Sequence, residues 1–141
     1  MSDTSFPRDI LVSENIRDKY LRPINDIDNK PFKDITDIYL MAAVFGLKNK
    51  MRIKSVRPKS IRQFRDLSDE QKLIMNTIAA TDKEFNTDIL LPENAKEMFK
   101  IVEEYANAGA SLLHDKVMIK RDNKATYEDM IWEEIKKISA K

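Results

Sequence analysis

The sequence has no cysteine, only two glycines among 141 residues, and a single histidine. Without cysteine the chain has no disulfide, thiolate zinc site, iron–sulfur cluster or cysteine nucleophile. This suits a reducing compartment, and we expect a cytoplasmic protein. A chain so poor in glycine is also a weak candidate for a fold of tight hairpins, because those turns need residues with positive φ. The composition therefore favours helices.

Long hydrophobic runs are absent too. No apolar stretch approaches the roughly 20 residues needed to span a bilayer, and the first ten residues lack the basic and apolar regions of a signal peptide. We therefore expect no contact with a membrane. Hydrophobic residues still make up 42% of the chain, which is enough to bury the core of one domain.

The spacing of the apolar residues predicts an all-α fold, a compact bundle of about five helices. We expect one domain over residues 1–141, with a flexible N-terminus at 1–10. A first helix is predicted at about 11–21, where Val12, Ile16, Tyr20 and Ile24 recur at spacing four. Met51 and Ile53 alternate with basic residues, which allows a short β-element near 51–56. The following stretch, "KSIRQFR", is compatible with one or two turns of helix.

The segment 34–46 is predicted to be the central helix, because it is apolar nearly all round. Asp34 and Asp37 lie in its first turn, where the helix dipole favours negative charge. Gly46 is placed to end the helix in a left-handed cap.

A capping box, "SDEQ" from Ser68 to Gln71, opens the next predicted helix, which we expect to run to about Phe85. Four apolar residues are predicted to face the core from this helix: Leu73, Ile74, Ile78 and Phe85.

A long helix of about twenty residues is predicted after Pro92, with the clearest apolar period in the chain. Its expected inner face consists of Ala95, Met98, Phe99, Val102, Tyr105, Ala106, Gly109, Leu112 and Leu113. Small residues cluster in "EYANAGASLL" (104–113), and a glycine in a helix interior costs about 1 kcal/mol relative to alanine. Close packing against the 34–46 helix would explain it, and a subunit interface is the alternative. A last helix is predicted with Thr126 as N-cap and Tyr127, Met130, Ile131, Ile135 and Ile138 on one face.

Charge is distributed very unevenly. The net charge is −2 over residues 1–47, +8 over 48–65 and −5 over 66–141. The basic segment, as we call residues 48–65, contains no acidic residue, and its eight cations are the candidate nucleic-acid-binding residues: Lys48, Lys50, Arg52, Lys54, Arg57, Lys59, Arg62 and Arg65.

Three interpretations of the basic segment remain open from sequence: a DNA contact, a surface for an acidic protein, and a solvated connector. Eight cations can neutralise several phosphates, and forked guanidinium groups suit phosphate oxygens. We expect Ile53, Ile61 and Phe64 to tie the segment to the core, which would make it a fixed ridge.

Few residues in the sequence suggest catalysis, so we predict no catalytic residue, no metal site and no cofactor. His114, beside Asp115, has no second ligand near it in sequence and suits a cation near a helix C-terminus. Adjacent carboxylates such as Glu103 and Glu104 point in different directions on a helix. The E-x-K patterns at 70–72 and 134–136 fall on predicted helices, whereas nucleases of that type place the pattern on a strand.

Two stretches together carry a family resemblance. "DIYLMAAVFGLKNKMRI" (37–53) is a helix that ends in an alanine pair, an aromatic–glycine step and a basic run, and "ILLPENAKEMFKIVEEYANAGASLL" (89–113) contains an E-Y-A-N-x-G helix. This combination resembles the Dnd system-associated protein 4 family over about residues 32–113. These small proteins are encoded near bacterial DNA phosphorothioation genes. The resemblance implies an accessory role in a DNA modification and restriction system and supplies no catalytic residues.

The resemblance and the charge pattern lead to one expectation and two alternatives. We expect a non-enzymatic accessory protein of a phosphorothioation-linked defence system that contacts DNA, or a DNA-handling partner from the same system, through the basic segment. One alternative is a protein–protein adaptor or assembly subunit without DNA contact. The remote alternative is a nuclease.

Overall fold

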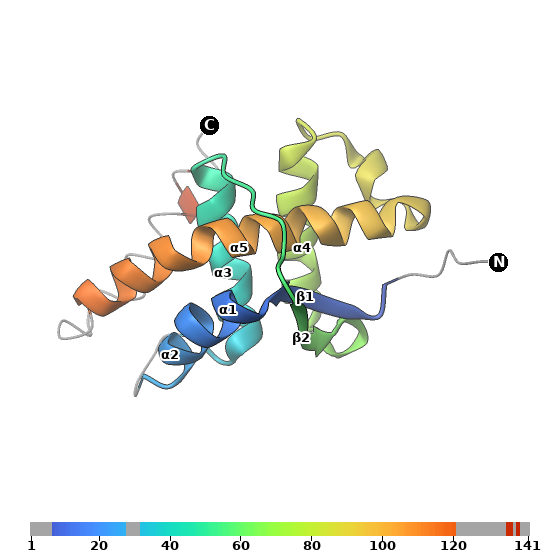
Figure 1. Cartoon of the computed structure of the whole chain (residues 1–141). Helices are drawn as coiled ribbons and strands as arrows, with labels where there is room; N and C mark the ends of the chain where they lie inside the picture. The colour runs from blue at the N-terminus through green and yellow to red at the C-terminus, as the bar shows by residue number, and fades with distance from the viewer. Residues whose placement is uncertain (1–6, 28–31, 121–134, 137, 139–141) are drawn as a thin grey trace.

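The computed structural model describes residues 7–27, 32–120, 135, 136 and 138 (Figure 1). Within these ranges the chain is mostly helical, with a two-stranded antiparallel sheet. The predicted fold class, helical with a short β-element, is therefore confirmed. None of the helices in the described ranges is both long and apolar enough to cross a membrane.

Helix α3, Ile35–Lys48, lies at the centre, as predicted, and every residue from Ile38 to Gly46 is buried. Asp34 caps its N-terminus, because the side chain accepts hydrogen bonds from the backbone N–H groups of Thr36 and Asp37. The apolar residues on all sides of this helix make it the element against which the others pack.

The N-terminal segment starts as a strand, not as the predicted helix. Residues Asp9–Ser13 form β1, so the predicted helix at 11–21 was wrong at its start and the strand includes Asp9 and Ile10. Helical turns then follow one another directly: α1 at Glu14–Ile16, a π-helical turn η1 at Arg17–Leu21 and α2 at Arg22–Asn25. Local periodicity could not reveal β1, because its partner strand lies about fifty residues later.

The partner strand is β2, Pro58–Gln63, which pairs with β1 in antiparallel fashion. Asp9 lies opposite Gln63 and Ser13 lies opposite Pro58, with an irregularity in register between Ile10 and Leu11. The β-element is thus later than the predicted 51–56, and the helical turns expected for "KSIRQFR" were wrong except for a short 3-10 turn, η2, at Phe64–Asp66. Proline is tolerated as the first residue of an edge strand.

Helix α4, Asp69–Asp82, begins at the predicted capping box. The Ser68 hydroxyl accepts a hydrogen bond from the Gln71 N–H at 3.0 Å, and the Ser68 N–H donates to the Gln71 side chain at 2.9 Å. Met75 and Ile78 are buried, and Ile74 is half-buried against the core.

Two of the predicted inward residues of this helix face solvent. Leu73 is 64% exposed, because the core-facing stripe of α4 consists of Gln71, Met75, Ile78 and Ala79. Phe85 is 72% exposed, because α4 ends at Asp82 and the chain turns away there. The predicted helix was therefore too long by three residues.

Two 3-10 turns, η3 at Thr87–Leu90 and η4 at Pro92–Asn94, lead into α5, Ala95–Lys120. This helix runs across the molecule and crosses both α3 and α4 (Figure 1). Its predicted inner face is confirmed, since Leu112 is half-buried and the other residues of that face are buried. At 26 residues α5 is longer than the twenty predicted.

The two glycines of the chain meet where α3 and α5 cross. A Cβ atom on Gly109 would lie 1.8 Å from the Ala42 carbonyl oxygen, and one on Gly46 would lie 2.2 Å from the Tyr105 carbonyl oxygen. The predicted close packing of the small-residue helix is confirmed. The left-handed cap at Gly46 was wrong: α3 continues to Lys48, neither glycine has positive φ, and Lys50 makes the turn with φ 54°.

Most of the predicted last helix, from Thr126 to Ile131, lies outside the described residues. Ile135 and Ile138 are described, and both pack against the core as expected.

Candidate nucleic-acid interface

The basic segment leaves the centre of the molecule at the end of α3 and returns to it through β2. Between them, residues 49–57 form an extended connector that crosses α5 (Figure 1). The amide group of Asn49 donates a hydrogen bond of 2.8 Å to the Phe45 carbonyl, which closes the last turn of α3. Lys50, with positive φ, then directs the chain onto α5.

Backbone hydrogen bonds hold the connector along its length. The N–H of Met51 donates to the Gly46 carbonyl at 3.0 Å, and the N–H of Ile53 donates to the Glu104 carbonyl at 3.1 Å. Further on, the N–H of Val56 donates to the Ser13 hydroxyl at 2.8 Å. The connector is therefore fixed to α3, α5 and β1 although it has no regular secondary structure.

Asn107 of α5 is the buried centre of this arrangement. Its side-chain oxygen accepts a hydrogen bond from the Ser13 N–H at 2.9 Å, and its amide nitrogen donates to the Ile53 carbonyl at 2.9 Å and to the Ser55 hydroxyl at 2.8 Å. The Ser55 hydroxyl also donates to the Glu103 carboxylate. One side chain that is 2% exposed thus joins β1, the connector and α5.

Arg52 is the member of the basic segment most deeply engaged within the fold. Its guanidinium lies 3.1 Å from Glu104 and 3.4 Å from Asp82, two carboxylates that are largely buried. It also lies over the ring of Tyr105, whose hydroxyl donates to Asp82. Burial and the Asp82 carboxylate raise the pKa of Tyr105 to about 12. This cluster anchors the connector and leaves Arg52 few free donors for a ligand.

Three other cations of the segment have looser acidic neighbours. Arg57 and Lys59 lie 3.8 Å and 3.9 Å from the same carboxylate, that of Glu14, and Arg62 lies 3.6 Å from Asp34. The Arg57 side chain is 80% exposed, so this pair is weak and open to competition from a ligand anion.

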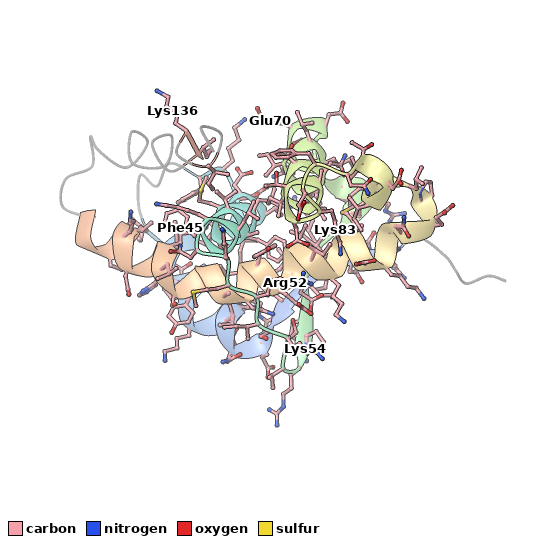
Figure 2. All side chains as sticks on the ribbon, turned by 90° about the horizontal axis from the view of Figure 1, so that it is seen from above. Phe45, Arg52, Lys54, Glu70, Lys83 and Lys136 are labelled. Atoms are coloured by element: carbon pink, nitrogen blue, oxygen red, sulfur yellow. The ribbon has the colours of Figure 1, made fainter. Side chains whose placement is uncertain are left out.

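Lys50, Lys54 and Arg65 are exposed and, unlike Arg52, Arg57, Lys59 and Arg62, have no ion pair among the described residues. Figure 2 shows Arg52 over α5 and Lys54 beyond the edge of that helix. The eight predicted candidates therefore divide by environment. Arg52 is structural, Arg57, Lys59 and Arg62 are paired at the surface, and Lys50, Lys54 and Arg65 present their charge to solvent. The eighth candidate, Lys48, is half-buried in the last turn of α3.

The apolar residues of the segment behave less uniformly than predicted. Ile61 and Phe64 pack against the core, as expected. Ile53 was wrongly expected to point inward: it is 49% exposed, because the connector is held through its backbone and through Asn107. Met51 at 45% and Val56 at 67% are exposed beside it, so apolar and basic side chains alternate on the surface of the connector.

A comparison with known families decides the membership of the chain. The family model of DNA sulphur modification system-associated protein 4 matches residues 19–141. The chain belongs to this family. The match extends the resemblance seen over 32–113 in both directions. No curated protein and no solved structure matches the chain.

The motifs that suggested the DNA sulphur modification family now have structural roles. In the E-Y-A-N-x-G helix, Glu104 pairs with Arg52, Asn107 joins β1 to the connector, and Gly109 permits the helix crossing. In the other motif, the end of α3, the Ala42 carbonyl and Gly46 are the groups that Gly109 meets at this crossing. These motif residues place the basic segment on the surface of the fold.

The remaining chemical candidates lie elsewhere. His114 is half-buried, with its ring 5.4 Å from that of Tyr20, and it sits six residues before the end of α5, so its expected role at a helix C-terminus was wrong. In the described part of the chain, no group of three or more His, Asp or Glu side chains could hold a metal ion. Glu70 of the first E-x-K pattern is exposed in the first turn of α4.

Proposed function

We propose that this member of the DNA sulphur modification system-associated family is a non-enzymatic accessory protein that contacts DNA phosphates through the solvent-facing cations of the basic segment. The observation that carries the proposal is the connector, whose backbone is fixed while Lys50 and Lys54 extend from it without acidic partners among the described residues. Cations on a fixed backbone lose less conformational freedom on binding than cations on a flexible loop.

The cations that have acidic partners are expected to contribute unequally to the proposed DNA contact. Arg57 and Lys59 both lie nearly 4 Å from the Glu14 carboxylate. Ion pairs this long at the surface are weak, so a phosphate can replace the carboxylate at little cost in free energy. Arg52 contributes little, because its partners are buried and would be left uncompensated if it turned outward. The proposed DNA surface is therefore centred on Lys50, Lys54 and Arg57.

The test is DNA binding by fluorescence anisotropy at several salt concentrations, with a short duplex. We expect Lys50→Ala/Lys54→Ala to weaken binding and to reduce the slope of log K against log salt by about 1.8, since each phosphate contact contributes about 0.9. The matched control is Lys19→Ala/Arg22→Ala, which removes two exposed cations of η1 and α2, outside the basic segment. Equal slopes for the two double variants, or no binding at low salt, would refute the proposal.

A second candidate function, a protein adaptor, is favoured by a separate observation. Met51, Ile53 and Val56 expose apolar surface between the cations of the connector. An acidic peptide with apolar residues at alternate positions would match this surface, whereas phosphates would leave it uncovered. Replacing Ile53 and Val56 by Ser separates the two functions: it should weaken capture of a partner protein from the same system and leave the salt dependence of DNA binding unchanged.

We do not place the adaptor surface on the small-residue stretch of α5 (104–113). Ala106, Ala108, Gly109 and Ala110 are buried within the fold, and Gly109 already contacts α3. This burial supports packing inside the chain over a subunit interface as the reason for the small residues.

A further inference from the structure

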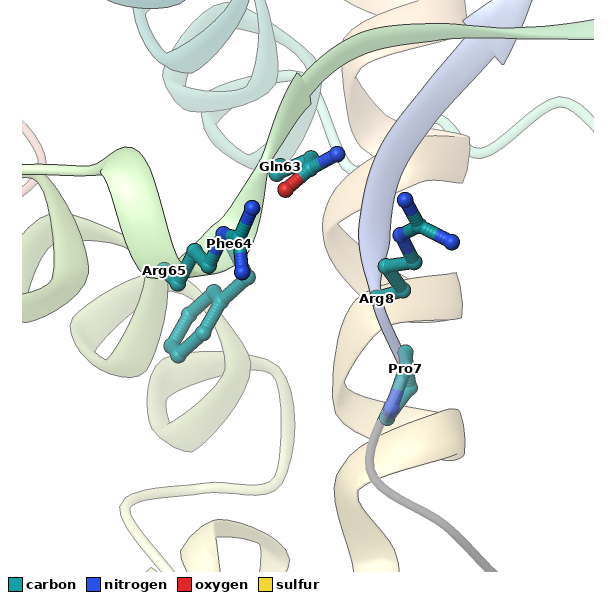
Figure 3. Close-up of a pocket in the computed structure, with 5 residues that line it drawn as sticks. All are labelled: Pro7, Arg8, Gln63, Phe64 and Arg65. Carbon is teal, nitrogen blue, oxygen red and sulfur yellow. The ribbon is translucent and has the colours of Figure 1, made fainter.

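A surface hollow lies where β1 begins and β2 ends. Among the described residues its lining comes from two segments distant in sequence: Pro7 and Arg8 on one side, and Gln63, Phe64 and Arg65 on the other. Figure 3 shows Arg8 on the β1 side and Arg65 on the β2 side, with Gln63 between the two strands. Arg65 is the last cation of the basic segment, whereas Arg8 was not among the residues predicted from sequence.

The backbone fixes the spacing of the two sides. The N–H of Phe64 donates to the Arg8 carbonyl at 2.8 Å, and Asp9 lies opposite Gln63 in the strand register. The ring of Phe64 lies 5.1 Å from the ring of Phe99 and packs against the core. The backbone on the two sides of the hollow is therefore held in place by the pairing of β1 with β2.

The electrostatic environment of the hollow is positive. Arg8 and Arg65 are both exposed, and neither takes part in the ion pairs of the described residues. A further cation, Lys72, does not line the hollow but lies close to it, with its ammonium group 5.1 Å from the centre of the Phe64 ring. The nearest acids in sequence are Asp9, which is half-buried and lies opposite Gln63 in the strand register, and Asp66, which is exposed in η2.

This set of groups suits a tetrahedral oxyanion. Two guanidinium groups offer forked pairs of donors that match phosphate oxygens, and the Gln63 amide adds neutral donors for a remaining oxygen. A stacked base is a poorer occupant, because the Phe64 ring is already engaged with Phe99.

We propose that the hollow binds one phosphate group of the DNA backbone, with Arg8 and Arg65 as its two cationic walls and Gln63 between them. The DNA source of that phosphate rests on the proposed function, whereas binding of the phosphate group itself does not. The hollow extends the proposed DNA surface from the connector to the end of β2 and adds Arg8 to it.

The first experiment follows phosphate binding directly by NMR. Inorganic phosphate is titrated into the full-length protein at constant ionic strength, while the side-chain signals of the arginines and of Gln63 are followed. We expect saturable shifts at Arg8, Gln63 and Arg65 and their loss in Arg8→Ala/Arg65→Ala. The control Lys19→Ala/Arg22→Ala should keep them. Small, non-saturating shifts spread over all surface cations would overturn the site.

The second experiment measures DNA binding with the same variants. We expect Arg8→Ala/Arg65→Ala to weaken binding of a short duplex and to reduce the salt slope by about 0.9, the value for one phosphate. If this variant binds DNA as the wild type does while Lys50→Ala/Lys54→Ala is impaired, the hollow is overturned as a DNA contact and the proposed function stands. If inorganic phosphate shifts the NMR signals of Arg8 and Arg65 but the protein does not bind DNA, the phosphate does not come from DNA. That result would overturn both the DNA part of this proposal and the proposed function.

Discussion

The backbone N–H of Ser13 donates a hydrogen bond of 2.9 Å to the side-chain oxygen of Asn107, although the two residues are 94 positions apart. The same Asn107 side chain donates to the Ile53 carbonyl and the Ser55 hydroxyl. One buried amide therefore holds both the end of β1 and the connector against α5.

Replacing Asn107 with Ala should lower the free energy of unfolding by about 2–4 kcal/mol, because it leaves a buried N–H of Ser13 and a carbonyl of Ile53 without partners. Urea unfolding followed by circular dichroism measures the change. Asn76→Ala on α4 is the matched control, since the described hydrogen bonds do not include its side chain, and it should change stability by less than about 0.5 kcal/mol. Similar losses for both variants would contradict the role of Asn107.

Arg52 should matter for stability more than any other cation of the connector. Arg52→Met leaves the Asp82 and Glu104 carboxylates without their counter-ion, and we expect a loss of about 1–3 kcal/mol, reduced from that of a fully buried pair because Arg52 is 35% exposed. Lys54→Met, on the same connector, should be nearly neutral. Thermal unfolding of the two variants side by side decides between a structural Arg52 and an ordinary surface cation.

Gly109→Ala should destabilise the protein, although the same change in most helices stabilises by about 1 kcal/mol. The added Cβ would lie 1.8 Å from the Ala42 carbonyl oxygen and 2.4 Å from the Gly46 nitrogen, and these backbone atoms cannot move aside without separating α3 from α5. We expect a loss of at least about 1–3 kcal/mol in urea unfolding. A gain in stability would show that the two helices do not cross so closely.

The helices could be predicted from sequence where the determining signals are local. The capping box at Ser68 and Gln71 and the apolar period of α5 each involve residues a few positions apart, and both predictions were confirmed. The crossing at Gly109 was also predictable, because a glycine that lowers helix propensity needs a packing reason.

The environment of the basic segment could not be predicted in the same way. The acidic neighbours of its cations come from distant parts of the chain: Glu14, Asp34, Asp82 and Glu104. The sequence of the basic segment does not reveal these partners. Its cations therefore looked equivalent in sequence, whereas in the structure they differ in exposure and in their acidic neighbours. Strand β1 was missed for the same physical reason, since pairing with β2 is a long-range interaction.

Phe85→Gly should leave stability unchanged or raise it by up to about 1 kcal/mol. Phe85 is 72% exposed and has φ 67°, a backbone conformation that glycine adopts without strain and that a bulky residue resists. Unfolding by urea checks the sign. A loss of about 3–5 kcal/mol, the usual cost of truncating a core phenylalanine, would instead restore the prediction that Phe85 points inward.

Tyr105 should make stability fall at high pH. Its folded-state pKa is raised to about 12, from the ordinary value of 10, by burial and by the hydrogen bond to Asp82. The folded state therefore holds the proton more tightly than the unfolded state between these two values. This contribution is complete below pH 10 and is lost as pH rises toward 12, at a rate of at most about 1.4 kcal/mol per pH unit. Urea unfolding from pH 9 to 12 should show wild type losing stability faster than Tyr105→Phe, which has no proton to lose. Parallel profiles would mean that the hydroxyl ionises at its ordinary pKa and that the cluster of Arg52, Asp82 and Tyr105 is open to water.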